Sequence, residues 1–317
     1  MPVDSRLKLI SNSSIGSLHT CPRKYQLTKV SPDSIREKSV HTEFGKMFGE
    51  GLQAILMGAS LEEAVLRAAL QWTIDLDEEL KDKSFWSAIT AIENFSVIRT
   101  STLLADYEVA YVEGKPATEL NFSIALPNGY YYRGYIDIVM QHVITGDYLV
   151  VDIKTTGAKY TDSRKFQNSP QAIGYSVVMD KVAPGLSSFD VLYYEYLTGL
   201  RKYTDHHFTI GHLQRAQWLR NLVIDTNIME YYGQYEDWPM HGGSACIGYG
   251  RPCQFMDICT MSTASITGGK METEDARKYD TKWDYDLGKA VPVEYTVEVT
   301  FQELVDTQMN KLDWVGA

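Results

Sequence analysis

The spacing of hydrophobic residues predicts helices over the first third of the chain. The serines at 13–14 are good N-cap residues for a helix that runs towards Leu27. Residues 43–57 repeat with the helical period, and two more helices are predicted over 61–80 and 85–112. The apolar side of the helix at 43–57 consists of Phe44, Met47, Phe48, Leu52 and Ile55.

The pattern then changes from the helical period to alternation, which is typical of strands. The alternating apolar residues are Leu120, Phe122, Ile124 and Leu126. Pro127-Asn128-Gly129 is a strong turn signal, and Thr145-Gly146-Asp147 is another. With return strands over 130–140 and 148–154, the sequence predicts a three-strand meander.

The second half mixes both element types. The elements predicted after the meander are a polar loop at 155–165, a helix at 166–181, a strand at 188–197 with a hairpin partner at 202–210, and a helix at 211–232. Residues 260–286 are rich in Ser, Thr, Gly and charge, so they are predicted to form a linker or extended arm. A final strand at 293–301 and a short helix follow.

Composition narrows the class of protein. The 317 residues are 44% hydrophobic and 22% charged, which excludes a chain that is mainly disordered. The 41 acidic and 30 basic residues give a net charge of −11, which argues against a basic nucleic-acid coat protein. No stretch approaches the roughly 20 apolar residues of a membrane span, and the start lacks a secretory signal. We therefore expect a cytoplasmic protein without membrane contact.

Two carboxylates and a lysine form the first candidate site. Asp152 and Lys154 are two apart on a predicted strand, so their side chains share one face, and Asp137 lies on the adjacent strand. Such a group would hold a divalent ion through hard oxygen ligands, while the lysine steadies a phosphate or a hydroxide. The alternative is a surface Asp–Lys pair, and spacing alone leaves both open. Gln171 and Tyr175 share a helix face just beyond, a weak signal by itself.

The four cysteines form the second candidate site. Cys246, Cys253 and Cys259 lie within fourteen residues, and Cys21 stands far away near the N-terminus. In a reducing compartment this clustering favours metal ligation over disulfides. Four thiolates suit a [4Fe–4S] cluster or a zinc site, and the alternative is four unrelated buried thiols.

Together these motifs resemble the PD-(D/E)XK nuclease superfamily, and specifically its RecB-like branch, which also includes the AddB nuclease, the CRISPR-adaptation nucleases and many phage exonucleases. The segments that carry the resemblance are Gly134 to Asp137, Asp152-Ile153-Lys154-Thr155-Thr156-Gly157 and Gln171 to Tyr175. The resemblance spans about residues 11 to 260. It implies an α/β fold with a restriction-endonuclease-like core, in which helices flank a mixed central sheet, preceded by an N-terminal helical region.

The resemblance also implies roles for the residues. Asp137 and Asp152 would ligate catalytic Mg²⁺ or Mn²⁺ with help from the Ile153 carbonyl. Lys154 would orient the nucleophile, and Gln171 and Tyr175 would contact the substrate strand.

One helix departs from the family pattern. Many members carry a His in a Gly-x-x-x-His-Glu motif, and here Gly49 holds that position in Gly45 to Glu50. Glu50 is the candidate replacement ligand, unless it belongs to a solvated helix face shared with Lys46 and Gln53. Glu119 at the start of the first strand is a further candidate.

The iron–sulfur members of the family place one cysteine before the nuclease core and three after it. Ser14 to Tyr25, which contains Cys21-Pro22, looks like that entry. The resemblance therefore favours a [4Fe–4S] staple at Cys21, Cys246, Cys253 and Cys259 over structural Zn²⁺. It predicts a nuclease domain over 1–263, with a helical insertion at about 58–112, and an acidic extension over 264–317.

The resulting hypothesis is a metal-dependent DNA exonuclease acting on single-stranded DNA or DNA ends, in recombination, repair or phage DNA processing. The 21 tyrosines offer surfaces that could stack bases, although packing explains most of them. Protein partners in a recombination or replication complex, and the host cytoplasm for a phage-encoded chain, are part of this hypothesis. The alternatives are a non-catalytic DNA-end-binding iron–sulfur protein with a degenerate nuclease site, and an iron–sulfur redox or sensor protein.

Overall fold

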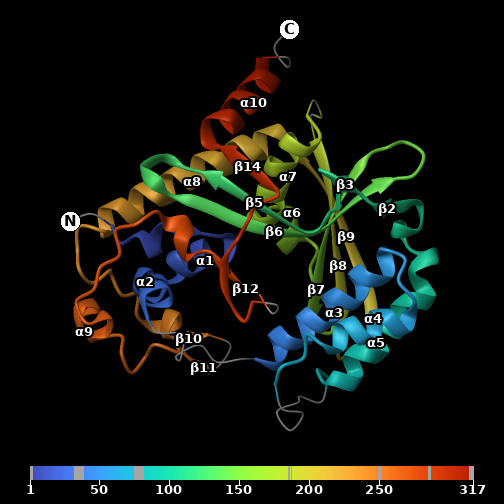
Figure 1. Ribbon diagram of the computed structural model, residues 1–317, viewed down its shortest axis with the longest axis horizontal. Helices are drawn as coiled ribbons and strands as arrows, with labels where there is room; N and C mark the ends of the chain where they lie inside the picture. The colour runs from blue at the N-terminus through green and yellow to red at the C-terminus, as the bar shows by residue number, and fades with distance from the viewer. Residues whose placement is uncertain are drawn as a thin grey trace. The chain divides into compact units, whose positions relative to one another are not determined.

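The computed structural model describes residues 3–31, 39–74, 82–184, 186, 188–248, 251–284 and 287–313. The chain divides into two compact units, each assembled from segments that are distant in the sequence (Figure 1). Unit 1 consists of Met1–Glu37, Asn121–Gly134 and Ala216–Ala317. Unit 2 consists of Lys38–Leu120 and Tyr135–Arg215.

Unit 2 is built on a mixed sheet. Its strands are β2 (Tyr107–Val109), β6 (Tyr131–His142, from Tyr135 onward), β7 (Tyr148–Thr156), β8 (Ser188–Leu197) and β9 (Lys202–Gly211). The order is β6-β7-β8-β9, with β7 and β8 parallel, the other neighbours antiparallel, and β2 paired with β6. The strands predicted at 130–140, 148–154, 188–197 and 202–210 are confirmed. The small hairpin of β3 (Tyr111–Val112) and β4 (Lys115–Pro116) precedes β5 (Thr118–Ala125).

Helices cover both faces of this sheet. They are α3 (Val40–Leu56), α4 (Leu61–Ala69), α5 (Phe85–Ile98), α6 (Arg164–Gln167) and α7 (Pro170–Val182). Figure 1 shows α3, α4 and α5 side by side next to the strands. Phe48 and Phe95 from these helices share a buried core with Val151 of β7. Because side chains alternate along a strand, Asp152 and Lys154 face the opposite side, where α7 packs against β7 and β8.

Two helix predictions in unit 2 are partly wrong. The helix predicted over 85–112 ends at Ile98, and 3₁₀ turns then lead into β2. Val109 pairs with Met140 of β6, so sheet hydrogen bonds decide the conformation there. The helix predicted over 61–80 ends at Ala69, and residues 75–80 lie outside the described part.

The helix predicted over 166–181 is divided into α6 and α7. Pro170 occupies the first turn of α7 and donates no backbone hydrogen bond that would continue α6.

Unit 1 holds both ends of the chain. Its helices are α1 (Asn12–Thr20), α2 (Pro22–Val30), α8 (His212–Tyr232, from Ala216 onward), α9 (Thr263–Thr267) and α10 (Phe301–Asp313). Its strands are β1 (Leu9–Ile10), most of β5, the start of β6, β10 (Ile247–Gly248), β11 (Arg251–Pro252), β12 (Thr281–Asp284), β13 (Lys289–Pro292) and β14 (Val297–Thr300). β14 pairs in parallel with β5, and β1 pairs in parallel with β6.

The N-terminal helical region consists of two helices where one was predicted. Cys21 is extended, with φ −161° and ψ 112°, and separates α1 from α2. Pro22, the first residue of α2, disfavours a helical conformation for the residue before it. The break therefore follows from the Cys-Pro pair itself.

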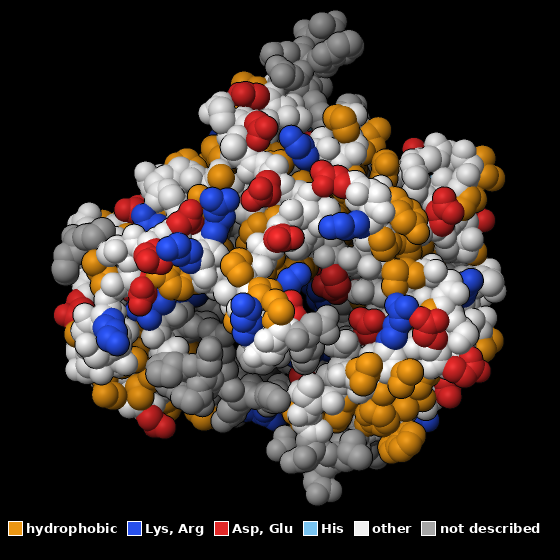
Figure 2. All heavy atoms as spheres, in the orientation of Figure 1, with side chains coloured by type: hydrophobic (Ala, Val, Ile, Leu, Met, Phe, Trp, Pro, Cys, Tyr) orange, Lys and Arg blue, Asp and Glu red, His pale blue; other side chains and the backbone are white. Residues whose placement is uncertain are grey.

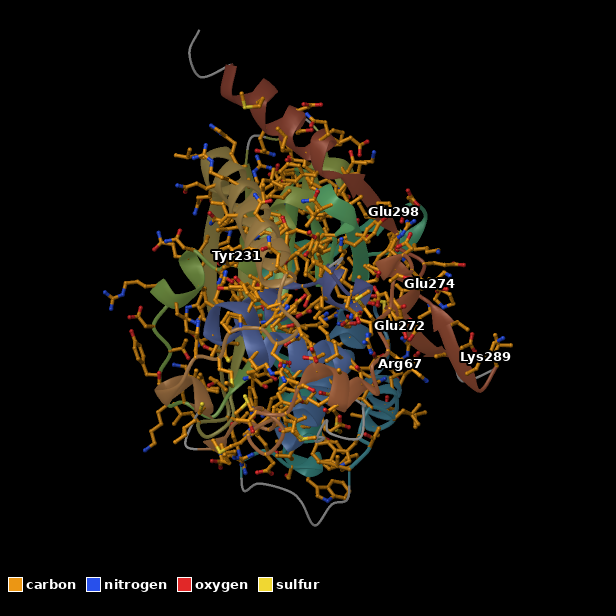
Figure 3. All side chains as sticks on the ribbon, turned by 90° about the vertical axis from the view of Figure 1, so that its left-hand side faces the viewer. Arg67, Tyr231, Glu272, Glu274, Lys289 and Glu298 are labelled. Carbon is orange, nitrogen blue, oxygen red and sulfur yellow. The ribbon has the colours of Figure 1, made fainter. Side chains whose placement is uncertain are left out.

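The segment at 260–286 is not a free linker in its described part. It forms α9, a 3₁₀ turn and β12, and the Ser5 N–H donates to the Glu272 carbonyl over 2.9 Å. Asp280 is 1% exposed and accepts hydrogen bonds from Arg133 and Tyr295. Figure 3 shows Glu272 and Glu274 of this segment and Glu298 of β14, all in unit 1.

Among the described residues, no helix has both the length and the apolar character of a membrane span.

Candidate active site

The candidate site lies where the β6–β7 ladder ends. The antiparallel pairing runs from Gln141 opposite Tyr148 to Ile138 opposite Val151. One residue further, the Ile153 N–H donates to Asp137 Oδ2 over 2.7 Å. The carboxylate of Asp137 therefore takes the place of a main-chain acceptor and is fixed beside β7.

The glycine of the Gly-x-x-Asp segment has a packing reason. A Cβ at Gly134 would lie 2.5 Å from Cζ of Phe122, which is itself fully buried in unit 1. A larger residue there would displace the Phe122 ring or β6. The absence of a side chain at Gly134 thus lets β6, the strand that carries Asp137, pass close to the Phe122 ring.

Four of the residues predicted from the sequence form one connected chain of contacts. The side chain of Asp152 is 0% exposed, and its Oδ2 lies 2.6 Å from Nζ of Lys154. Lys154 Nζ also donates to Gln171 Oε1 over 3.3 Å. Gln171 Nε2 donates to the Tyr175 hydroxyl over 2.6 Å. Because Gln171 and Tyr175 are four residues apart on α7, they share one helix face. Gln171 contacts Lys154, and Tyr175 contacts Gln171.

The electrostatics of this site favour an added cation. Burial, reinforced by the charge of Asp152, raises the pKa of the Asp137 carboxyl to about 8. Burial also raises the pKa of Asp152, against the opposing effect of Lys154. Burial alone would lower the pKa of Lys154, but the two carboxylates outweigh it and raise that pKa. One lysine does not compensate two buried carboxylates.

The donor set fits a divalent metal ion. Neither carboxylate oxygen of Asp152 has a hydrogen bond of normal geometry among the described residues, although Lys154 forms an ion pair with one of them. Buried oxygens without such partners are costly unless a ligand satisfies them. Within the described part of the chain, no three His, Cys, Asp or Glu side chains are arranged to hold a metal together. Asp137 and Asp152 would thus supply two ligands, and Mg²⁺ commonly completes its shell with carbonyl oxygen, water and substrate phosphate.

Asp137 and Lys154 border a cavity of about 560 Å³ in unit 2. The cavity is lined by Gly45, Lys46, Gly49, Glu50, Gln53, Gln71, Glu119, Asp137, Ile153, Lys154 and Thr155. One side of α3 therefore faces the carboxylates of the sheet. On the helix face that Glu50 shares with Lys46 and Gln53, Gln53 is 5% exposed and the Lys46 side chain is 55% exposed, so this face is solvated only in part.

Glu50 and Glu119 add acidic groups to this cavity. Glu119 has a left-handed backbone, with φ 48°, and its Oε1 accepts a hydrogen bond from Gln53 Nε2 over 2.8 Å. Loss of hydration, opposed by that hydrogen bond and aided by Glu50 and Asp152, raises the pKa of Glu119. Both candidate support residues are therefore in electrostatic reach of the same site.

Gly49 and Glu43 of α3 show what surrounds the position where the family has a histidine. A Cβ at Gly49 would meet no atom within 4 Å, so the histidine position opens into free space. Glu43, one helix face away, is 2% exposed and accepts from Lys46 and from both the N–H and hydroxyl of Thr73. Glu43 therefore has a structural role.

No pattern in the sequence pointed to Lys83, which precedes the capping residue Ser84 of α5. Lys83 is 6% exposed, and its Nζ lies 3.5 Å from Oγ1 of Thr155 in the cavity wall. Only the tertiary structure brings it to this site.

The four cysteines lie in unit 1 and all are free thiols. Burial raises the pKa of Cys259; Arg23 opposes this rise, and Cys21, Cys253 and Cys246 add to it. Cys21, Cys246 and Cys253 are therefore each in electrostatic reach of Cys259. Their arrangement among the described residues is not that of a metal site.

Arg23 holds the backbone of the segment around Cys259 through hydrogen bonds. It is 1% exposed, donates to the Cys259 carbonyl over 3.2 Å and also donates to the Met261 carbonyl. The Cys253 N–H donates to the Cys246 carbonyl over 2.8 Å in the β10–β11 hairpin. The backbone around the thiols is thus held by the protein's own contacts.

Comparison with known proteins identifies the family. The model of the PD-(D/E)XK nuclease superfamily matches residues 9–260, which is most of the chain. No curated protein sequence matches.

Two solved structures are similar at low identity. A protein from Eubacterium rectale described as a "putative exonuclease" has a TM-score of 0.46 and 13% identity, covering 83% of this chain and 94% of that one. The protein SSO0001 has a TM-score of 0.31 and 13% identity, covering 79% of this chain and 97% of that one. At these scores we draw no conclusion from either likeness.

Proposed function

Because the chain belongs to the PD-(D/E)XK nuclease superfamily, we propose that it is a divalent-metal-dependent deoxyribonuclease, and specifically an exonuclease on single-stranded DNA or DNA ends. The observation that carries this proposal is the half-buried Asp137 at the cavity together with the fully buried Asp152 and its ion-pair partner Lys154. Recombination, repair or phage DNA processing would be its setting.

Each residue of the site has a chemical task in this proposal. Asp137 and Asp152, with the Ile153 carbonyl, would hold Mg²⁺ or Mn²⁺. Glu50, which lines the same cavity, is proposed as a further ligand, although the three carboxylates are not grouped around one point among the described residues. Such an ion supplies Lewis-acid polarisation of the phosphate and a water of lowered pKa.

The remaining side chains act on the substrate. Lys154, held at Asp152 and Gln171, places its ammonium beside the scissile phosphate and stabilises the charge that builds there. Gln171 and Tyr175, linked to each other, contact the substrate strand and fix the lysine.

A second candidate function is DNA-end binding without catalysis. The observation that favours it is the empty position at Gly49, where the family places a histidine. Against it, Lys154 forms an ion pair with Asp152 and lines the cavity, and binding alone does not require a lysine in that place.

Incubation with labelled DNA separates the two functions. The protein is mixed with single-stranded, linear duplex and circular DNA in Mn²⁺, with and without EDTA, beside an Asp152→Asn control. Loss of linear DNA that needs metal and Asp152 is the expected result, and intact circles identify an exonuclease. DNA that stays intact in Mn²⁺ while binding the protein would overturn the catalytic proposal.

Tyrosine exposure bears on the preference for single strands. Tyr193, Tyr194 and Tyr196 are at most 3% exposed and serve packing. Tyr231 and Tyr235 are 55% and 50% exposed and leave ring surface for base stacking. A single-strand preference therefore rests on the second group.

We also propose a [4Fe–4S] cluster at Cys21, Cys246, Cys253 and Cys259, with structural Zn²⁺ as the alternative. The observation behind this proposal is four free thiols, of which Cys21, Cys246 and Cys253 lie in electrostatic reach of Cys259, although they are not grouped around one point among the described residues. Elemental analysis and the visible spectrum of anaerobically purified protein decide between them. Stoichiometric zinc without iron would overturn the cluster.

Domain limits, partners and location remain proposals. The nuclease domain would cover 1–263 and the acidic extension 264–317, and the protein would act in the cytoplasm or the host cytoplasm.

Figure 2 shows hydrophobic side chains gathered over α4 and the start of α5, where Leu66, Leu70 and Trp86 are 64%, 74% and 66% exposed. Such a patch supports protein partners in a recombination or replication complex.

A further inference from the structure

Lys83 is a buried cation that has no counter-charge within ion-pair distance among the described residues. It is 6% exposed, and burial is the sole cause that lowers the pKa of its ammonium. No carboxylate of the described residues forms an ion pair with it. Its contacts are Thr155 Oγ1 at 3.5 Å and the ring of Phe44 at 5.6 Å.

Such a lysine costs stability. A buried ammonium loses its hydration, and one long hydrogen bond with a ring face replaces little of it. An apolar side chain of similar length would fit the same surroundings at lower cost. The charge at this position therefore requires a reason other than folding.

The hydroxyl of Thr155 connects this charge to the cavity. Because Lys83 donates to Oγ1, the hydroxyl hydrogen remains available to donate to a third group. No acceptor for it is present among the described residues. A Cβ at Gly45 would stand 3.9 Å from Oγ1, and both Gly45 and Thr155 line the cavity, so the absence of a side chain at Gly45 leaves the hydroxyl open to it.

The position along β7 identifies the ligand class. Thr155 directly follows Lys154, whereas Glu50, Glu119 and Asp137, which also line the cavity, are acidic. An anion in the cavity would thus be attracted to the Thr155 side. A phosphate group offers several acceptor oxygens and matches a hydroxyl donor backed by a cation.

We propose that Thr155 binds a phosphate of the nucleic-acid strand next to the scissile phosphate, and that Lys83 is the positioning residue that orients its hydroxyl and supplies the charge. This rests on the proposed nuclease function. The phosphate can be internal to the strand or at its end, and the two sources share the same chemistry.

Binding of labelled single-stranded DNA in an Asp152→Asn background tests the proposal without cleavage. The variants are Lys83→Met, Thr155→Val and both together, and Lys115→Met serves as the control because it removes an exposed lysine of unit 2 outside the cavity. Dissociation constants are measured over a range of salt concentrations, and melting temperatures are measured for every variant.

We expect Lys83→Met to bind DNA more weakly than its parent without a fall in melting temperature. Lys83→Met weakens binding equally for all DNA sequences. It also lowers the magnitude of the slope of log K against log salt concentration (the salt slope) by about 0.7, the value of one phosphate contact on a single strand. Thr155→Val weakens binding, and the double variant is no weaker than Lys83→Met because the two act as one unit. The melting temperature of Lys83→Met does not fall, and Lys115→Met binds as its parent does.

Oligonucleotides with a 5′-phosphate, a 3′-phosphate or hydroxyl ends locate the phosphate. A loss that is equal for all three identifies an internal phosphate, and a loss confined to one identifies an end. Parent-like affinity and slope in both Lys83→Met and Thr155→Val would overturn the proposal, whether or not their melting temperatures fall. A parent protein that binds no DNA would overturn the proposed function and this assignment with it.

Discussion

The main-chain N–H of Ile153 and the carboxylate of Asp137 are joined by a hydrogen bond of 2.7 Å at the point where the β6–β7 ladder ends. This bond fixes Asp137 without help from substrate or metal. Asp152 lacks a comparable partner and depends on Lys154. The two carboxylates of the site are therefore held by different means, and their variants should differ.

The raised pKa of Asp137 predicts how stability varies with pH. This pKa is about 8 in the folded protein, against 3.8 for an ordinary aspartate. Between these values the folded state holds a proton that the unfolded state has released, so stability falls as pH rises towards 8. We expect the melting temperature in EDTA to fall over this range. Asp137→Asn should flatten the fall, and an unchanged slope would contradict the assignment.

The same pKa predicts the pH dependence of metal binding. The ion requires the ionised carboxylate, so binding releases a proton below pH 8. Affinity for Mn²⁺ should tighten by up to about tenfold per pH unit until that pH is reached. Calorimetric titration at several pH values measures it, and pH-independent affinity would refute this expectation.

Asp152→Asn should abolish activity while preserving the fold. It removes a proposed metal ligand and also relieves repulsion with Asp137, so the melting temperature in EDTA should not fall. Lys154→Met should lower activity by about 10²–10³-fold and also reduce stability, because Asp152 loses its cation. Cleavage assays and thermal melting check both, and wild-type cleavage by either variant would show that the site is misassigned.

Glu50 and Glu43 form a matched pair on α3. Glu50→Gln should raise the Mn²⁺ concentration needed for half-maximal rate, because Glu50 lines the cavity. Glu43→Gln should leave that concentration unchanged and lower the melting temperature, because Glu43 is buried and held by Thr73. An identical metal titration for wild type and Glu50→Gln would leave Glu119 as the supporting carboxylate.

The open position at Gly49 can accept a larger residue. A Cβ there meets nothing within 4 Å, whereas a Cβ at Gly51 would lie 2.4 Å from Ile92. Gly49→Ala should therefore stabilise α3 by about 0.5–1 kcal/mol, and Gly51→Ala should destabilise the protein. Gly49→His should lower the Mn²⁺ requirement relative to Gly49→Ala, since it adds a nitrogen ligand at the cavity. If both Gly49 variants titrate alike, no metal lies within reach of that position.

Cys21→Ala should bleach the protein and lower its melting temperature. A cluster shared by Cys21 and the segment Cys246 to Cys259 would close a loop of more than 220 residues, so its loss removes a constraint on the unfolded chain. Activity should fall together with folding. Visible absorption and calorimetry measure the change, and a colourless wild-type protein with unchanged melting would contradict the cluster.

The sequence predicted the frame of unit 2 because its signals are local. Alternation identified β5, the turn signals at 127–129 and 145–147 identified β6 and β7 as its return strands, and the helical period identified α3. The Asp152-x-Lys154 spacing placed both side chains on one strand face, and Gln171 and Tyr175 on one helix face, as the structure has them.

Elements set by non-local pairing were missed. β2 was assigned to a helix because three residues carry too little alternation to reveal a strand, and its conformation is decided by its ladder with β6. The Cys21-Pro22 break was a local signal that could have been used.

The sequence by itself determined that the residues proposed to carry the chemistry share strand and helix faces, because their spacing follows from strand and helix geometry. Only the tertiary structure decided which neighbours they meet. The burial that raises the pKa of Asp137, the separate fates of Glu43 and Glu50, and the approach of Lys83 to Thr155 arise from chain segments far apart in sequence. Desolvation and contact between such segments depend on packing, which no local pattern encodes.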